Sequence, residues 1–302
     1  MSSPCSSVSY SPIRLQFKSP EVKNHLNAPE AVLCSPSNTY VIRQQQTSNG
    51  VHVLLPTAAG PNGNQNIGVT AISQCTSSLE LMQAPAGSAT PNIKALLPLF
   101  DEPEDADKPY NLYHDKGYVF ENTPMSDVEC HQVWNHLVAF EMPPSLHLPR
   151  RCFRPSSNAL SKAWLRLLDI SRAEGINLAG TLRTGTMLEA LWNPDEDWPH
   201  ELRAAILTRL SLKSAAMSAK EHAESVLRDG STLDRAATVQ WVGLLILQSR
   251  TETEPDTPRL PKSIFLETWK DSLPEDWRED ANLDALPVSL SCHKFLLPLT
   301  FV

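Results

Sequence analysis

The chain has 302 residues, with 26 Lys and Arg side chains against 34 Asp and Glu, so its formal net charge is −8. A hydrophobic fraction of 41% and a charged fraction of 20% exclude a disordered acidic tail and a fibrous repeat. The longest aliphatic run, residues 242–247, is far shorter than the ~20 residues of a membrane-spanning helix. With 11 glycines and 25 prolines, the composition disfavours a glycine-rich nucleotide-binding enzyme and favours short elements joined by proline-containing loops.

Charge is unevenly distributed along the chain. Residues 1–100 carry +2, residues 101–149 carry −8, residues 150–250 carry +3 and residues 251–302 carry −5. The protein is therefore not a polycation that binds nucleic acid by charge alone, although a basic helical face within 150–250 can still contact phosphates. The six cysteines form no CxxC pair and the N-terminus has no apolar signal segment. We expect reduced thiols in the cytosol or nucleus.

The first hundred residues predict an all-β module of short strands. The β-branched and apolar stretches that indicate strands are 31–34, 39–43, 51–55, 67–72 and 78–82. Asn49-Gly50 favours a hairpin turn, because both central residues of a type I′ turn need positive φ. The Gly-, Asn- and Pro-rich residues 56–66 predict a surface loop, and the acidic residues 101–107 predict a solvated loop.

Beyond residue 123 the pattern is helical. Residues 123–129 offer an N-cap and an acidic first turn, and apolar residues recur at helical spacing after them. Further amphipathic helices are expected at 156–173, 186–191, 200–210, 219–227, 234–248 and 263–273. Groups of short helices at roughly 70-residue spacing favour tandem three-helix or winged-helix modules, although no short sequence period is visible.

These patterns predict a division into six segments. They are a β-rich subunit-assembly module at 1–100, an acidic linker at 101–122, winged-helix-like domains at 123–192 and 193–250, a linker at 251–262, and a partial third winged-helix-like domain at 263–302. The predicted fold class is α+β.

No catalytic constellation emerges from the sequence. Phosphate-binding loops, dinucleotide-binding glycines, zinc-protease and serine-hydrolase motifs and calcium-binding loops are all missing from the sequence. Cys130-His131 with His136 forms a poor metal set, because adjacent helical residues point about 100° apart. The acidic residues 195–197 fit the first turn of a helix without any metal. We expect no enzyme activity, no cofactor and no metal.

One N-terminal motif is distinctive. Val32-Leu33-Cys34 is followed by Thr39-Tyr40 with Arg43, and then by Ser48-Asn49. This order and spacing resemble the N-terminal motif of the "defective in sister chromatid cohesion" family, an accessory subunit of the cohesion-linked, replication factor C-like clamp loader. Trp198-Pro199 and the Phe265–Trp269 helix also resemble the family's winged-helix region.

The resemblance implies a partial β-barrel that partner subunits complete, followed by tandem winged-helix domains. It implies a nuclear, non-catalytic subunit that binds a small cohesion subunit and the large ATPase subunit of the clamp loader. Through that complex it would serve the sliding clamp and bridge the loader to DNA, directly or indirectly, and to the leading-strand DNA polymerase epsilon. A membrane role is not implied. The family's leucine-rich segment upstream of the cysteine strand has no counterpart between residues 17 and 31, and the last helical module ends early, so a shortened form is expected.

The candidate site residues follow from this reading. Cys34, Tyr40, Arg43, Ser48 and Asn49 are expected to shape the partner-binding β module, with Ser48-Asn49 setting the turn. Lys162, Arg166 and Arg172 are the candidate DNA contacts. The alternative function is a free-standing winged-helix DNA-binding regulator, and a hydrolase using Cys130 or a carboxylate pair is a third hypothesis without supporting spacing.

Overall fold

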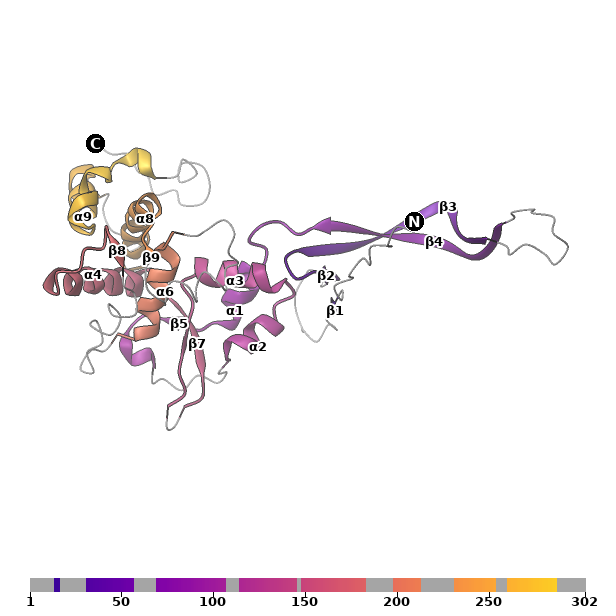
Figure 1. Ribbon diagram of the computed structural model, residues 1–302, viewed down its shortest axis with the longest axis horizontal. Helices are drawn as coiled ribbons and strands as arrows, with labels where there is room; N and C mark the ends of the chain where they lie inside the picture. The colour runs from indigo at the N-terminus through magenta and orange to yellow at the C-terminus, as the bar shows by residue number, and fades with distance from the viewer. Residues whose placement is uncertain are drawn as a thin grey trace, which may run out of the picture. The chain divides into compact units, whose positions relative to one another are not determined.

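A computed structural model describes the chain at residues 14–16, 31–56, 69–106, 114–145, 148–182, 198–212, 231–253 and 260–286. The chain forms two compact units. Unit 1 comprises residues 1–88 together with 124–129, and unit 2 comprises residues 89–123 and 130–302. The fold is mixed, with small sheets and several helices (Figure 1).

Unit 1 is built on one antiparallel sheet with the strand order β1-β2-β3-β4. Its strands are β1 (Arg14–Gln16), β2 (Val32–Cys34), β3 (Thr39–Pro56) and β4 (Val69–Gln83). The short β1 and β2 pair beside the beginning of β3, whereas β3 and β4 pair along their whole length as a long two-stranded ribbon (Figure 1). The predicted strands at 31–34, 39–43, 51–55 and 78–82 are confirmed, and the candidate at 67–72 begins at Val69.

The predicted hairpin turn at Asn49-Gly50 is wrong. β3 continues through both residues to Pro56, so the two predicted strands at 39–43 and 51–55 are one strand. The β3–β4 register shifts there, since Gln46 pairs with Ser77 and Val51 pairs with Cys75. Residues 47–50 therefore form a bulge opposite Thr76, and the strand continues through it instead of reversing direction.

Unit 2 consists of helices around short strand pairs. The helices are α1 (Thr90–Leu96), α2 (Lys116–Glu121), α4 (Ser157–Ala173), α6 (His200–Leu210), α8 (Arg235–Thr253) and α9 (Lys262–Asp271), with α3 (Asp127–His136) contributing its residues from Cys130 onward. The strands are β5 (Leu99–Phe100), β6 (Phe140–Met142), β7 (Arg151–Pro155), β8 (Thr181–Leu182) and β9 (Ser231–Thr232). β7 pairs parallel with β5 and antiparallel with β6, and β8 pairs antiparallel with β9.

The core of unit 2 lies around α4, which packs against α8 and α6. Trp164 and Leu167 of α4 are fully buried, and the Trp164 indole donates to the Ser272 carbonyl at 2.8 Å. The Trp269 indole of α9 donates to the Val239 carbonyl at 2.9 Å. These buried bonds satisfy the polar atom of each indole while the ring fills the core.

Most predicted helices that fall within the described residues are confirmed. Ser156 caps α4 by accepting from the Ala159 amide, α6 has the predicted bounds, and α8 extends five residues beyond the predicted end at Gln248 to Thr253. Phe140, expected on the helix of residues 124 onward, lies instead in β6. The helices predicted at 186–191 and 219–227 lie outside the described residues.

The acidic residues 101–107 are only partly the solvated loop that their charge predicts. Pro103–Ala106 form a 3₁₀ helix, and Asp105 is buried. Its carboxylate accepts from the amides of Asp101 and Glu102 at 2.7 and 3.1 Å, so local hydrogen bonds offset the burial of this charge. Among the helices in the described ranges, none combines the length and apolar character that crossing a lipid bilayer requires.

Candidate partner interface

The most exposed apolar surface of the described residues lies on the β3–β4 ribbon. Thirteen large apolar side chains are exposed among the described residues. Eight of them belong to these two strands: Val53, Leu54, Leu55, Val69, Ile72, Leu79, Leu81 and Met82. Leu79 is 69% exposed and Leu81 is 50% exposed. Exposed apolar side chains in this number on two paired strands indicate an interaction site.

Strand register assigns two of these side chains, Leu79 and Leu81, to one face of the sheet, and Met82, which lies opposite Val41, to the other face. Ile42 lies opposite Leu81, and Tyr40 lies opposite both Leu33 and Gln83. Residues directly opposite each other share a face, and alternate residues of a strand return to it. Leu33, Tyr40, Ile42, Leu79 and Leu81 therefore lie on the same side of the sheet, which we call the apolar face.

The opposite face is closed near the start of β3 by residues 124–129. Thr39 is fully buried on this face; its hydroxyl donates to the Glu129 carboxylate at 2.5 Å and accepts from the Ser126 amide at 2.8 Å. The Cys34 thiol lies 3.8 Å from the same hydroxyl. Because the Thr39 proton goes to Glu129, the thiol is the donor in that contact.

Ser126 and Glu129 also form a capping box at the start of α3. The Ser126 hydroxyl accepts from the Glu129 amide at 3.3 Å, and the Glu129 carboxylate accepts from the Ser126 amide at 3.3 Å and from the Ser126 hydroxyl at 2.6 Å. The Ser-x-x-Glu spacing is the sequence signature of this cap. Among the described residues, the sheet thus closes one of its faces on a helix start, while Leu79 and Leu81 on the apolar face stay exposed.

The sheet also has open edges within the described ranges. β4 is paired only through β3, and β2 covers β3 only from Thr39 to Val41. Unpaired backbone N–H and C=O groups along such an edge can accept a further strand. Exposed apolar side chains beside an open edge give this sheet both parts of a β-strand addition site.

The predicted interface residues occupy different positions in this sheet. Cys34 and Tyr40 are half-buried, and burial raises the pKa of the Cys34 thiol. Arg43 is exposed and lies directly opposite Glu80 in the register of β3 and β4. Ser48 and Asn49 lie in the β3 bulge, so the role of turn setters predicted for them is wrong.

The three predicted DNA contacts lie on the exposed side of α4, where Lys162 and Arg172 bond to other residues of the protein. Lys162 forms an ion pair with Glu102 at 2.6 Å. Arg172 pairs with Asp169 and donates to the carbonyls of Asp271 and Leu273. Arg166 is exposed between them. Internal partners reduce the positive charge that this face offers to a phosphate.

The cysteine and histidine residues that were considered as metal ligands or nucleophiles are buried or packed against other side chains. Cys130 is fully buried, and His131 packs edge-to-face against Phe120 with ring centroids 4.8 Å apart. Within the described ranges, no three His, Cys, Asp or Glu side chains form a metal-binding group. The acidic residues 195–197 lie outside those ranges.

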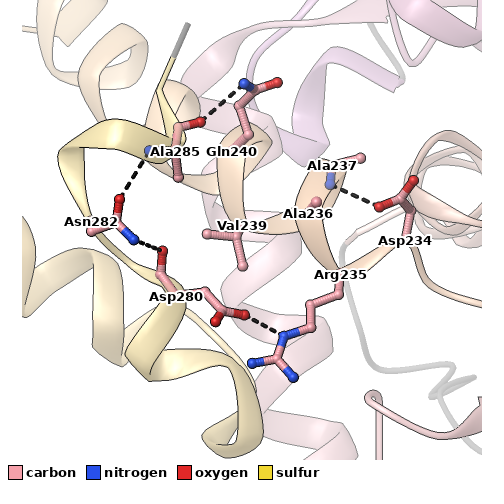
Figure 2. A pocket seen from close by; sticks show the side chains of 9 residues that line it. All are labelled: Asp234, Arg235, Ala236, Ala237, Val239, Gln240, Asp280, Asn282 and Ala285. Carbon is pink, nitrogen blue, oxygen red and sulfur yellow. Dashed lines mark hydrogen bonds and ion pairs between the residues drawn. The ribbon is translucent and has the colours of Figure 1, made fainter.

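Figure 2 shows an open pocket of about 600 Å³ between the start of α8 and the 3₁₀ turns that follow α9. Arg235 pairs with Asp280, and Gln240 donates to the Ala285 carbonyl at 3.0 Å. Asn282 accepts from the Ala285 amide at 3.1 Å, and Asp234 accepts from the Ala237 amide at 3.0 Å. The Arg235–Asp280 and Gln240–Ala285 bonds fasten the 3₁₀ turns, Glu275–Asp280 and Leu283–Ala285, to α8, whereas Asp234 and Asn282 cap the elements that they begin.

The comparisons with known proteins agree with the N-terminal motif. The sequence matches the protein family described as sister chromatid cohesion protein Dcc1 over residues 10–291. No curated protein matches the sequence significantly. Because the family match covers nearly the whole chain, from before β1 to beyond the last 3₁₀ turn, this protein belongs to the Dcc1 family and has a role in sister chromatid cohesion.

Proposed function

We propose that this protein is a non-catalytic accessory subunit of an alternative, replication factor C-like clamp loader in the nucleus. The observation that carries the proposal is the exposed apolar face of the unit 1 sheet beside edges that no other described strand covers. A small cohesion subunit and the C-terminal tail of the large ATPase subunit would add strands to this sheet and complete a shared barrel. Family membership in sister chromatid cohesion supports a partner of this kind.

The proposed activities of the complex would belong to different parts of it. ATP hydrolysis would belong to the large subunit, since this sequence carries no phosphate-binding loop. Unit 2, proposed to comprise winged-helix modules, would bridge the loader to DNA and to DNA polymerase epsilon. A free-standing DNA-binding regulator is less well supported, because Lys162 and Arg172 on α4 are already paired within the protein.

Co-expression tests the assembly. The full chain is produced with the small cohesion subunit and the C-terminal tail of the large subunit, and the mixture is separated by size-exclusion chromatography. A single peak containing one copy of each chain supports the proposal. Elution of this chain apart from both partners, with its helical circular dichroism intact, contradicts it.

Two alanine variants refine the placement of the predicted motif. Tyr40 lies on the apolar face, so Tyr40→Ala should reduce the amount of complex. Arg43 lies three residues further along β3, on the opposite face, and Arg43→Ala should reduce it less. If neither substitution changes complex formation, the motif does not contribute to partner binding.

A further inference from the structure

The turn between β2 and β3 is closed by a serine hydroxyl. The amide of Ser35 donates to the carbonyl of Asn38 at 2.8 Å. The amide of Asn38 donates to the Ser35 hydroxyl at 2.9 Å, and that hydroxyl donates to the Asn38 carbonyl at 3.0 Å. The side chain of Ser35 thus bonds both backbone groups of Asn38, so the closed turn depends on one hydroxyl.

The same serine is followed by a proline in an accessible part of the chain. Ser35 is partly exposed, and Pro36 and Ser37 at the tip of the turn are exposed. A proline disfavours the helical conformation for the residue before it, so Ser35 is restricted to extended backbone. Protein kinases bind the segments that they modify in extended form, and a serine directly before a proline is the minimal acceptor of proline-directed kinases. Ser35 therefore combines that dipeptide with an accessible turn.

The strand pairing that this turn joins is short. β2 has three residues, and it pairs with β3 only from Thr39 to Val41. Short pairings at the surface open locally at a lower free-energy cost than global unfolding, which allows a kinase to reach the hydroxyl. Since β2 contributes Leu33 to the apolar face, opening this turn alters the surface proposed for partner binding.

Thr123-Pro124 carries the same kind of dipeptide in a closed setting. Thr123 is fully buried, and its hydroxyl donates to the Val119 carbonyl at 2.7 Å. A kinase reaches this hydroxyl only after the surrounding core has opened. Thr123 therefore serves as an internal control for Ser35.

We propose that Ser35 is a phosphorylation site for a proline-directed protein kinase, and that the phosphate opens the β2–β3 turn and weakens the addition of partner strands to the unit 1 sheet. The effect on partner strands rests on the proposed function. In the transfer, the bond between the γ-phosphorus of ATP and its bridging oxygen breaks, and a bond between that phosphorus and Oγ of Ser35 forms. ADP leaves, and the hydroxyl proton passes to the catalytic base of the kinase.

Phosphorylation removes the contacts that keep the turn closed. The proton that Ser35 donates to the Asn38 carbonyl is replaced by a phosphoryl group, which does not fit between two oxygens that lie 3.0 Å apart. The surroundings are also unfavourable for a phosphate. Burial raises the pKa of the adjacent Cys34 thiol, and the carboxylates of Glu129 and Asp127 raise it further, so their negative potential reaches this end of β2. A phosphate with a charge of about −1.5 to −2 is repelled by the same carboxylates.

The first measurement asks whether the folded chain accepts phosphate at Ser35. The full chain is incubated with ATP, Mg²⁺ and a cyclin-dependent kinase that phosphorylates a synthetic peptide of residues 31–40, and mass spectrometry quantifies each site. Ser35 should be modified roughly tenfold faster than the buried Thr123. Ser37→Ala is the matched control, because Ser37 lies in the same turn without a following proline, so this variant should be modified at the wild-type rate. A folded chain that carries no phosphate at Ser35, or acquires it no faster than at Thr123, overturns the proposal.

The second measurement follows the turn itself, without any partner. The Asn38 amide donates to the Ser35 hydroxyl, so its hydrogen exchange should become severalfold faster in the phosphorylated chain. Enzymatic phosphorylation is used instead of Ser35→Asp, because an aspartate side chain can itself accept from the Asn38 amide and keep the turn closed. Unchanged exchange at Asn38 would show that the phosphate leaves the turn closed and would overturn its proposed effect.

The third measurement tests assembly with the partner subunits by co-elution. The phosphorylated chain should give severalfold less complex than the untreated chain, whereas Ser35→Ala should give the same amount with and without kinase treatment. Equal amounts of complex from the phosphorylated and untreated wild type overturn the link to assembly. If the untreated chain does not bind the partners, the proposed function fails, while the mapping and exchange measurements still decide whether Ser35 is modified and opens the turn.

Discussion

The hydroxyl of Thr39 and the carboxylate of Glu129 are joined by a 2.5 Å hydrogen bond across 90 residues of sequence. Thr39 begins β3, and Glu129 is the third residue of α3. This bond connects the sheet to the capping box at the start of α3. The buried Thr39 therefore secures the closed face of unit 1 and leaves the apolar face available to partners.

The Thr39 bond predicts a loss of stability in a nearly isosteric variant. Thr39→Val removes both hydrogen bonds of the hydroxyl and leaves the Ser126 amide and the Glu129 carboxylate with fewer partners in a buried place. The free energy of unfolding should fall by about 1–3 kcal/mol. Chemical denaturation followed by circular dichroism measures the change.

The matched control is Thr268→Val on α9. The Thr268 hydroxyl donates to the Ile264 carbonyl on an exposed helix surface, so its loss should change stability by less than about 0.5 kcal/mol. Equal effects of the two substitutions would show that the Thr39 network does not stabilise unit 1.

Gly243 predicts a steric effect in the core of unit 2. A Cβ atom on Gly243 would lie 2.6 Å from two atoms of the Trp269 ring. Gly243→Ala should therefore destabilise the protein by about 1–3 kcal/mol, despite the better helix propensity of alanine. Gly180→Ala is the control, because its added Cβ meets its nearest neighbour at 3.5 Å. Thermal unfolding that ranks Gly243→Ala at or above the wild type would contradict this packing.

His136 predicts a pH dependence of stability. Burial, Arg209 and Lys94 lower its pKa below the ordinary value of 6.5, so the unfolded chain takes up a proton more readily than the folded one. Stability therefore declines as the pH falls from about 6.5 toward the lowered pKa, and His136→Gln should remove that part of the decline. Denaturation midpoints over a pH series measure it. An identical pH profile in the variant would mean that His136 titrates normally.

Cys152 predicts an unreactive thiol. Burial raises its pKa, and the nearby carboxylates of Glu141 and Asp115 raise it further. Because the thiolate is the reactive form, alkylation by iodoacetamide should be far slower in the folded protein than in denaturant. Peptide mapping by mass spectrometry distinguishes Cys152 from the other cysteines. Equal rates in the folded and unfolded states would refute its burial.

Local signals predicted much of the secondary structure. The cap within residues 123–129, the bounds of α6 and the helix predicted at 156–173 all depend on residues close in sequence, and the structure has them where they were expected. The hairpin predicted at Asn49-Gly50 was wrong because β3 continues through these residues with a bulge. Pairing with β4 determines whether the chain turns or continues as a bulged strand. No local sequence pattern reveals that pairing.

Long-range arrangement accounts for what the sequence could not predict. Thr39 gave no sign of its bond to Glu129, since its role depends on how the sheet meets a distant helix start. The contact of Arg209 on α6 with His136 on α3 joins residues 73 apart in the sequence, so no local spacing identifies it. Conversely, the sequence made Lys162 a candidate DNA contact on an amphipathic helix. Its ion pair with Glu102 is evident only from the structure.

The most direct test of the account compares two double variants of the β3–β4 ribbon in the co-expressed complex. Leu79→Ser with Leu81→Ser alters the apolar face, whereas Gln45→Ala with Glu80→Ala removes an exposed cross-strand hydrogen bond on the opposite face. The account predicts that the leucine variant no longer co-elutes with the partner subunits, while the control variant does. Co-elution of the leucine variant at the wild-type level would contradict the assignment of this face to partner binding.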